Sequence, residues 1–132
     1  MKRIDYDAKV GELRKTGLCC AQITLLAGME IRGEENPQLI NAARTLCSGM
    51  HRQKVCGAVT GGCLMLCLWD SPQTKQMVKQ FGEWFETEFG TMACGELIAK
   101  RKEDEKYSCG NLIRGAVNKC QELLIENGLI EE

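Results

Sequence analysis

The stretch that decides the fold runs from Val55 to Trp69 and reads VCGAVTGGCLMLCLW. It is the longest part of the chain without a charged residue. A membrane-spanning helix needs roughly 18 to 20 apolar residues, and this stretch is shorter. We therefore expect a helix buried in the core of a soluble protein.

The segments on both sides of this stretch carry apolar residues at helical spacing. Apolar side chains recur every three or four positions from Pro37 to about Met50, from about Pro72 to Phe89 and from Cys109 to about Glu126. Asn36-Pro37 and Ser71-Pro72 each place a side-chain acceptor at the cap and a proline at the first helical position. These patterns predict amphipathic helices that pack around the central one.

Glycines mark the expected helix ends, because glycine adopts the left-handed conformation that releases a chain from its last turn. Five of them follow a predicted helix: Gly17, Gly28, Gly33, Gly90 and Gly128. No segment resembles a pair of β-strands. The sequence predicts an all-α protein, residues 1–132 forming a single-domain helical bundle of about six helices.

Composition and charge exclude several classes of function. The formal net charge is -1, from 17 basic and 18 acidic residues. This balance offers no basic surface for nucleic acid or for an anionic membrane. The first residues turn charged at once and lack the apolar core of a secretory signal, so we expect a cytoplasmic protein without membrane insertion.

Nine cysteines in 132 residues are far above ordinary usage. An odd number in a reducing compartment favours metal ligation, redox chemistry or simple burial over a disulfide framework. Cys47 and Cys120 fall on apolar stripes, which predicts that they pack in the core. Cys63 and Cys67 lie one turn apart on the most apolar helix, where packing is the expected role and metal chelation the alternative.

The other informative cysteines each follow a break in the chain and precede a helical run: Cys20, Cys56, Cys94 and Cys109. Unpaired N–H groups and the positive end of a helix dipole favour the thiolate, which predicts a thiol pKa below the free value of about 8.5. Glycine follows three of them, although it costs about 1 kcal/mol in a helix. We expect a partner helix, a second sulfur or a cofactor cluster to approach the bare backbone at Gly57 and Gly61.

Several compact motifs are absent from the sequence. There is no C-x-x-C, which argues against a thioredoxin-like dithiol, and no C-x-x-C-H, which excludes c-type haem. Ferredoxin spacing is absent too. His51 is the only histidine, which excludes a histidine-rich zinc site. Any cluster or disulfide must be assembled from cysteines distant in sequence.

The chain resembles the C-GCAxxG-C-C family of redox-active proteins over Gly17 to about Leu124. The central signature is similar to Cys56-Gly57-Ala58-Val59-Thr60-Gly61, and the upstream element to the residues around Cys20. The third and fourth elements resemble the segments around Cys94 and Cys109.

The resemblance implies a cytoplasmic protein of prokaryotes, often encoded near transporters, whose four characteristic cysteines have a redox role. The chain departs from the pattern at Gly110, where proline is common. It also has additional cysteines: Cys19, Cys47, Cys63, Cys67 and Cys120.

Three hypotheses follow. In the first, the four cysteines converge at one end of the bundle and carry out electron transfer or thiol–disulfide exchange with an unknown redox partner, Cys56 being the attacking thiolate. In the second, the same four thiolates hold an iron–sulfur cluster or another soft metal ion. In the third, the protein is a non-catalytic regulatory module associated with a transporter. The sequence leaves open whether the protein is an enzyme.

Overall fold

The computed structural model describes residues 1–132 and contains seven α-helices and no β-sheet. In chain order the helices are α1 (Asp7–Lys15), α2 (Cys20–Arg32), α3 (Pro37–Ala43), α4 (Gly57–Cys67), α5 (Thr74–Phe89), α6 (Cys94–Arg101) and α7 (Cys109–Glu126). Short 3₁₀ turns follow α3 at Arg44–Leu46 and precede α7 at Glu105–Tyr107. The predicted all-α class is confirmed, with seven helices where about six were expected.

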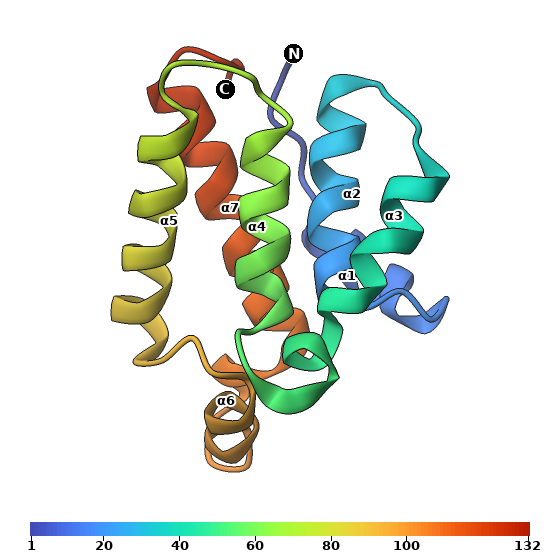
Figure 1. The fold of residues 1–132 in the computed structure, drawn as a ribbon, viewed down its shortest axis with the longest axis vertical. Helices are drawn as coiled ribbons and strands as arrows, with labels where there is room; N and C mark the ends of the chain where they lie inside the picture. The colour runs from blue at the N-terminus through green and yellow to red at the C-terminus, as the bar shows by residue number, and fades with distance from the viewer.

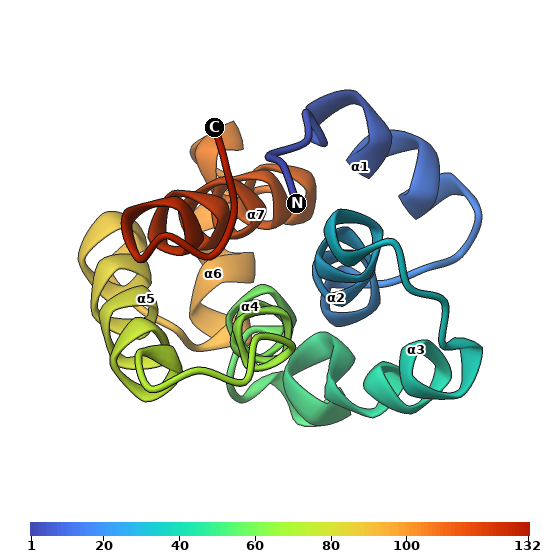
Figure 2. The same ribbon diagram turned by 90° about the horizontal axis from the view of Figure 1, so that it is seen from above.

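Helix α4 lies at the centre of the bundle, as predicted for the uncharged stretch. It packs against α2, α5 and α7. Figure 2 shows α4 between α2 and α5, while Figure 1 shows α6 lying across the lower end of the bundle. The side chains of Met65 and Leu66 on α4 are fully buried. They belong to one core cluster of 24 buried residues, which makes the chain a single domain.

Glycines explain how closely α2 and α4 approach each other. A Cβ atom added to Gly61 would lie 2.9 Å from the Cα and O atoms of Ala21 and from Cβ of Thr24. One added to Gly28 would lie 2.9 Å from Cγ of Met65. The prediction that Gly28 ends a helix is therefore wrong, because this residue is a packing site inside α2. The other four predicted ends are confirmed by positive φ angles at Gly17, Gly33, Gly90 and Gly128.

Helix α3 is shorter than predicted, ending at Ala43 rather than near Met50. Four consecutive residues then adopt left-handed backbone angles, with φ of 53° at Ser48, 59° at Gly49, 61° at Met50 and 58° at His51. Left-handed angles cost roughly 1–2 kcal/mol at each non-glycine residue, so surrounding contacts must hold this left-handed turn. The turn connects α3 to the start of α4.

The two helix starts marked by proline were predicted with different accuracy. Asn36 caps α3 as predicted, its Oδ1 accepting a hydrogen bond of 3.1 Å from the Leu39 N–H. Helix α5, in contrast, begins at Thr74, two residues after Pro72. Its Phe81, Phe85 and Phe89 side chains face the core as the spacing predicted.

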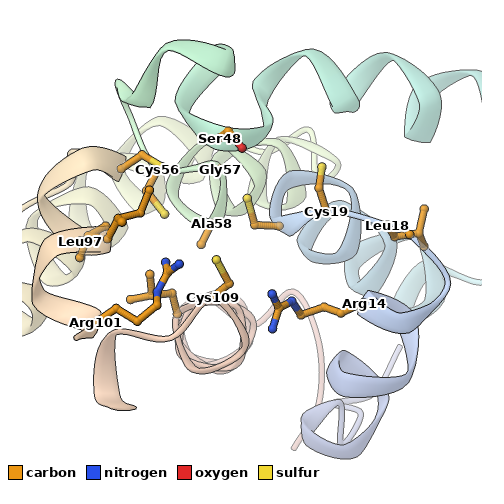
Figure 3. Close-up of a pocket in the computed structure, with 15 residues that line it drawn as sticks. Arg14, Leu18, Cys19, Ser48, Cys56, Gly57, Ala58, Leu97, Arg101 and Cys109 are labelled. Atoms are coloured by element: carbon orange, nitrogen blue, oxygen red, sulfur yellow. The ribbon is translucent and has the colours of Figure 1, made fainter. Parts of the chain in front are cut away.

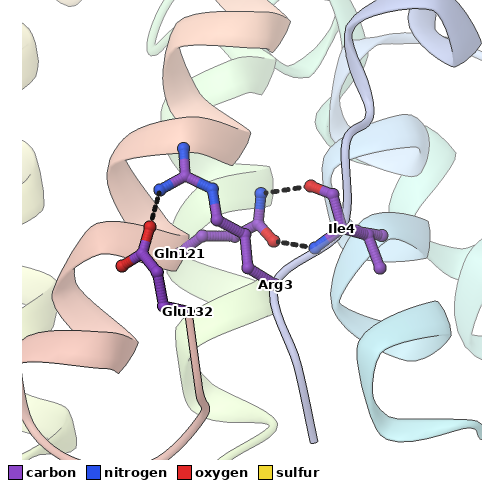
Figure 4. A network of polar contacts seen from close by, with 4 residues as sticks. All are labelled: Arg3, Ile4, Gln121 and Glu132. Carbon is purple, nitrogen blue, oxygen red and sulfur yellow. Dashed lines mark hydrogen bonds and ion pairs between the residues drawn. The ribbon is translucent and has the colours of Figure 1, made fainter.

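The two ends of the chain lie together at the end of the bundle away from α6 (Figure 1). The backbone of Arg3 donates to the carbonyl of Glu131 at 2.8 Å. The side-chain amide of Gln121, fully buried, donates to and accepts from the backbone of Ile4, as Figure 4 shows. None of the helices combines the length and the apolar character needed to cross a membrane.

Candidate redox site

Four helices begin around one cavity and bring four cysteines to it. Cys20 is the first residue of α2, Cys94 of α6 and Cys109 of α7, while Cys56 immediately precedes α4. All four line a single cavity of about 310 Å³, shown in Figure 3. Residues separated by up to 89 positions in sequence thus share one pocket, as the first hypothesis required.

A short backbone pairing fixes Cys56 and Cys94 relative to each other. Val55 and Ala93 form an isolated antiparallel β-bridge. On either side of it, the Cys56 N–H donates to the Met92 carbonyl at 2.7 Å and the Cys94 N–H donates to the Lys54 carbonyl at 2.6 Å. The starts of α4 and α6 are therefore joined, and both cysteines are directed from this pairing into the cavity.

The two glycines proposed as cofactor contacts have different surroundings. Gly57 lines the cavity, and a Cβ atom there would overlap the sulfur of Cys20. The sulfur of Cys20 is therefore the second sulfur that was expected to approach Gly57. Gly61 does not line the cavity and instead touches the backbone of Ala21. Close helix packing, the simpler explanation, accounts for Gly61.

The expected lowering of thiol pKa is wrong for three of the four cysteines. Burial raises the pKa of Cys56 to about 12 and also raises the pKa of Cys20 and Cys94. The helix start does act as predicted, since the N–H groups of Ala58 and Val59 lower the pKa of Cys56. Burial outweighs them because the Cys56 side chain has left water almost completely, with 5% of the residue exposed.

The cavity thiols also influence one another. After burial, a negative charge on Cys109 is the next contribution that raises the pKa of Cys94, and it also raises that of Cys20. A charge on Cys20 in turn raises the pKa of Cys56. These mutual effects are consistent with the four thiols lining the same cavity, since Coulomb energy falls with distance.

A disulfide joins Cys19 to Cys47, with a Cα–Cα distance of 6.0 Å. The sequence placed Cys47 in the core, which is correct for its burial, but missed its bond to Cys19. Cys19 lines the cavity next to Cys20, and Cys47 directly precedes the left-handed turn. Within that turn, the Ser48 N–H bonds to the Cys20 sulfur and lowers its pKa. The disulfide therefore anchors the turn beside the cavity.

The three remaining cysteines lie outside the cavity. Cys120 is fully buried in the core, as predicted, and burial raises its pKa. Cys63 is half-buried, with a pKa raised by burial to about 11, and Cys67 is exposed. Across the chain, no group of three or more His, Cys, Asp or Glu side chains has the arrangement of a metal site.

Two arginines line the cavity that sequence reasoning did not select. Arg14 comes from the last turn of α1 and Arg101 from the end of α6. The positive charge of Arg101 lowers the pKa of Cys94, although burial has the larger effect. Arg52 and Lys54, which closely precede Cys56 in the sequence, are exposed and do not line the cavity. Which basic residues reach the cavity depends on the tertiary fold and cannot be seen in the sequence alone.

Comparison with known protein families gives one match. The family model described as "Putative redox-active protein (C_GCAxxG_C_C)" matches residues 18–123. The chain belongs to this family. Its match confirms the resemblance found in the sequence, and the matched residues of this C-GCAxxG-C-C protein include all four cavity cysteines. Comparison with curated proteins and with solved structures gives no match.

Proposed function

We propose that the protein exchanges disulfides with a partner molecule through the four cavity cysteines. The observation that carries this proposal is the convergence of four thiols from four helices on one cavity. Three of these cysteines, Cys20, Cys94 and Cys109, are half-buried, so a partner sulfur can reach them from solvent. Thiol–disulfide exchange needs this combination of an accessible attacking sulfur and a neighbouring resolving sulfur.

Cys94 is the best candidate for the first attack. It is half-buried, and the positive charge of Arg101 lowers its pKa and so offsets part of the increase caused by burial. Both properties raise the amount of accessible thiolate, which is the attacking species. Cys56 is less suited to the role predicted for it, because it is buried and its pKa is about 12. We assign Cys56 to an inner pair with Cys20, whose sulfur contacts Gly57.

Cys109 is the candidate resolving thiol because its charge has the largest influence of any neighbour on Cys94. In the first step, the Cys94 thiolate attacks one sulfur of the partner disulfide R–S–S–R, forms a mixed disulfide and releases R–S⁻, which takes up a proton. In the second step, the Cys109 thiolate attacks the Cys94 sulfur and releases the second R–S⁻. Two cysteines lose two electrons, and the partner disulfide gains them.

Trapping the mixed disulfide tests this assignment. Reduced Cys109→Ser protein is mixed with a small disulfide under anaerobic conditions, and the adduct is mapped by mass spectrometry. We expect an adduct that persists on Cys94, because the resolving thiol is missing, whereas Cys94→Ser protein forms much less. Cys67→Ser is the matched control, since Cys67 is exposed and lies outside the cavity.

Two results would overturn the proposal. Equal adduct formation in the Cys94→Ser, Cys109→Ser and Cys67→Ser proteins would show that the cavity thiols have no special reactivity. Stoichiometric iron and sulfide in anaerobically purified protein, lost in the Cys94→Ser variant, would establish the cluster hypothesis instead.

A further inference from the structure

The charge of the cavity points to the kind of molecule that it receives. Apart from the cysteines, its titratable lining side chains are Arg14 and Arg101, and no aspartate or glutamate lines it. Figure 3 shows both guanidinium groups directed toward the space beside Cys109, one from each side. The protein as a whole has a net charge of -1, so this positive lining is a local feature.

Neither arginine is neutralised by an acidic side chain. No carboxylate lies within the 4.0 Å ion-pair limit of either guanidinium group. Arg101 donates from Nε to the Tyr107 carbonyl at 3.1 Å, which orients the side chain and leaves its two terminal nitrogens free. A guanidinium group with free terminal nitrogens can bind a carboxylate with two parallel hydrogen bonds. Two such groups can hold two anionic groups.

Most of the remaining lining is apolar. Leu18, Leu97, Ile98 and Leu112 contribute hydrocarbon surface to the cavity. At about 310 Å³ the cavity lies at the lower end of the range of ligand pockets, about 300–1,000 Å³. The starts of α2, α4, α6 and α7 add the positive ends of four helix dipoles. A small anion with a short apolar body fits these conditions.

We infer that the partner molecule is a low-molecular-weight disulfide that carries carboxylates, which Arg14 and Arg101 bind so that its sulfurs meet Cys94 and Cys109. This inference rests on the exchange reaction proposed above and names its substrate class. The reaction keeps the same balance: two cysteine thiols become one disulfide, and the bound disulfide leaves as two anionic thiols.

Three aliphatic disulfides of similar size test the inference. They are 3,3′-dithiodipropionate with two negative charges, bis(2-hydroxyethyl) disulfide with none and cystamine with two positive charges. The rate of thiol loss from the reduced protein is divided by the rate of the same disulfide with free 2-mercaptoethanol, which removes differences in intrinsic reactivity. We expect the corrected rate to be at least about tenfold higher for dithiodipropionate than for the neutral compound, and lowest for cystamine.

Variants that each remove one positive charge show which residues cause the preference for dithiodipropionate. Arg14→Gln and Arg101→Gln are each expected to reduce the preference for dithiodipropionate severalfold. The matched controls Lys15→Gln and Lys102→Gln remove a positive charge at the neighbouring positions, outside the cavity, and are expected to leave the preference unchanged. Raising the salt concentration of wild-type protein supplies a measurement without a variant, and it should reduce the preference because it screens the attraction.

The outcomes separate this inference from the proposed function. If all three disulfides react with the same corrected rate, exchange stands and the anionic substrate class is wrong. If the arginine variants and the lysine controls behave alike, the binding role of the arginines is wrong. If the reduced protein reacts with none of the three disulfides, the exchange function itself fails.

Discussion

Replacing Gly61 with alanine tests the contact between α2 and α4, because helix propensity and close packing have opposite effects on stability at this position. Alanine at this position gains about 1 kcal/mol in helix propensity over glycine. Its Cβ, however, would lie 2.9 Å from the Cα and O atoms of Ala21, which are backbone atoms that cannot rotate away. Overpacking of this kind costs typically about 1–3 kcal/mol. We expect Gly61→Ala to lower the free energy of unfolding by roughly 1 kcal/mol.

Gly82→Ala is the matched control for this substitution. Gly82 lies inside α5, and a Cβ atom there would meet nothing within 4 Å. The same propensity gain then acts without overpacking, so stability should rise by about 1 kcal/mol. Urea denaturation under reducing conditions, followed by helical circular dichroism, measures both variants. If Gly61→Ala stabilises the protein as much as Gly82→Ala does, the close packing of α2 on α4 is refuted.

Three further predictions concern the sulfurs. Gly57→Ala should displace the Cys20 sulfur and slow disulfide formation between Cys20 and Cys56 roughly tenfold, as mass spectrometry of the oxidised protein would record; an unchanged rate would contradict the contact between Gly57 and the Cys20 sulfur. Cys19→Ser should lower the stability of the oxidised protein by about 2–4 kcal/mol, since the bond to Cys47 spans 28 positions, and reductant should bring wild type to the level of the variant. Iodoacetamide labelling of Cys56 should accelerate about tenfold per pH unit from about pH 7 to pH 11, because only the thiolate reacts and its pKa is about 12. A labelling rate that levels off near pH 9, read by mass spectrometry, would contradict the raised value.

Local signals in the sequence were sufficient to predict much of the helical fold. The limits of α7, Cys109–Glu126, agree with the predicted range of Cys109 to about Glu126 because the apolar stripe is regular. The structure adds a cap at Ser108, which accepts a hydrogen bond from the Asn111 N–H. The extension of α3 to Met50 was wrong because hydrophobic spacing does not report the handedness of the backbone. Three non-glycine residues in the left-handed turn gave no sign of their positive φ angles.

The site was predictable only where it depends on helix starts. That feature, together with the family pattern, selected the four cysteines that the fold brings to one cavity, and their chemical roles stay predictions. The direction of the pKa shift at Cys56 was missed because burial is a property of the tertiary structure. The partner of Cys47 and the positions of Arg14 and Arg101 were missed for the same reason, since no local pattern relates them to residues many positions away.

The meeting of the two chain ends has a practical consequence for experiments on this molecule. Arg3 and Glu131 pair at one pole of the bundle, and the thiol cavity lies at the other, where α2, α4, α6 and α7 begin. A fluorophore, an electrode linker or a fused reporter attached at either end would therefore point away from the reacting sulfurs. Immobilisation through that pole would present the cavity outward to solution, in a uniform orientation suited to electrochemistry.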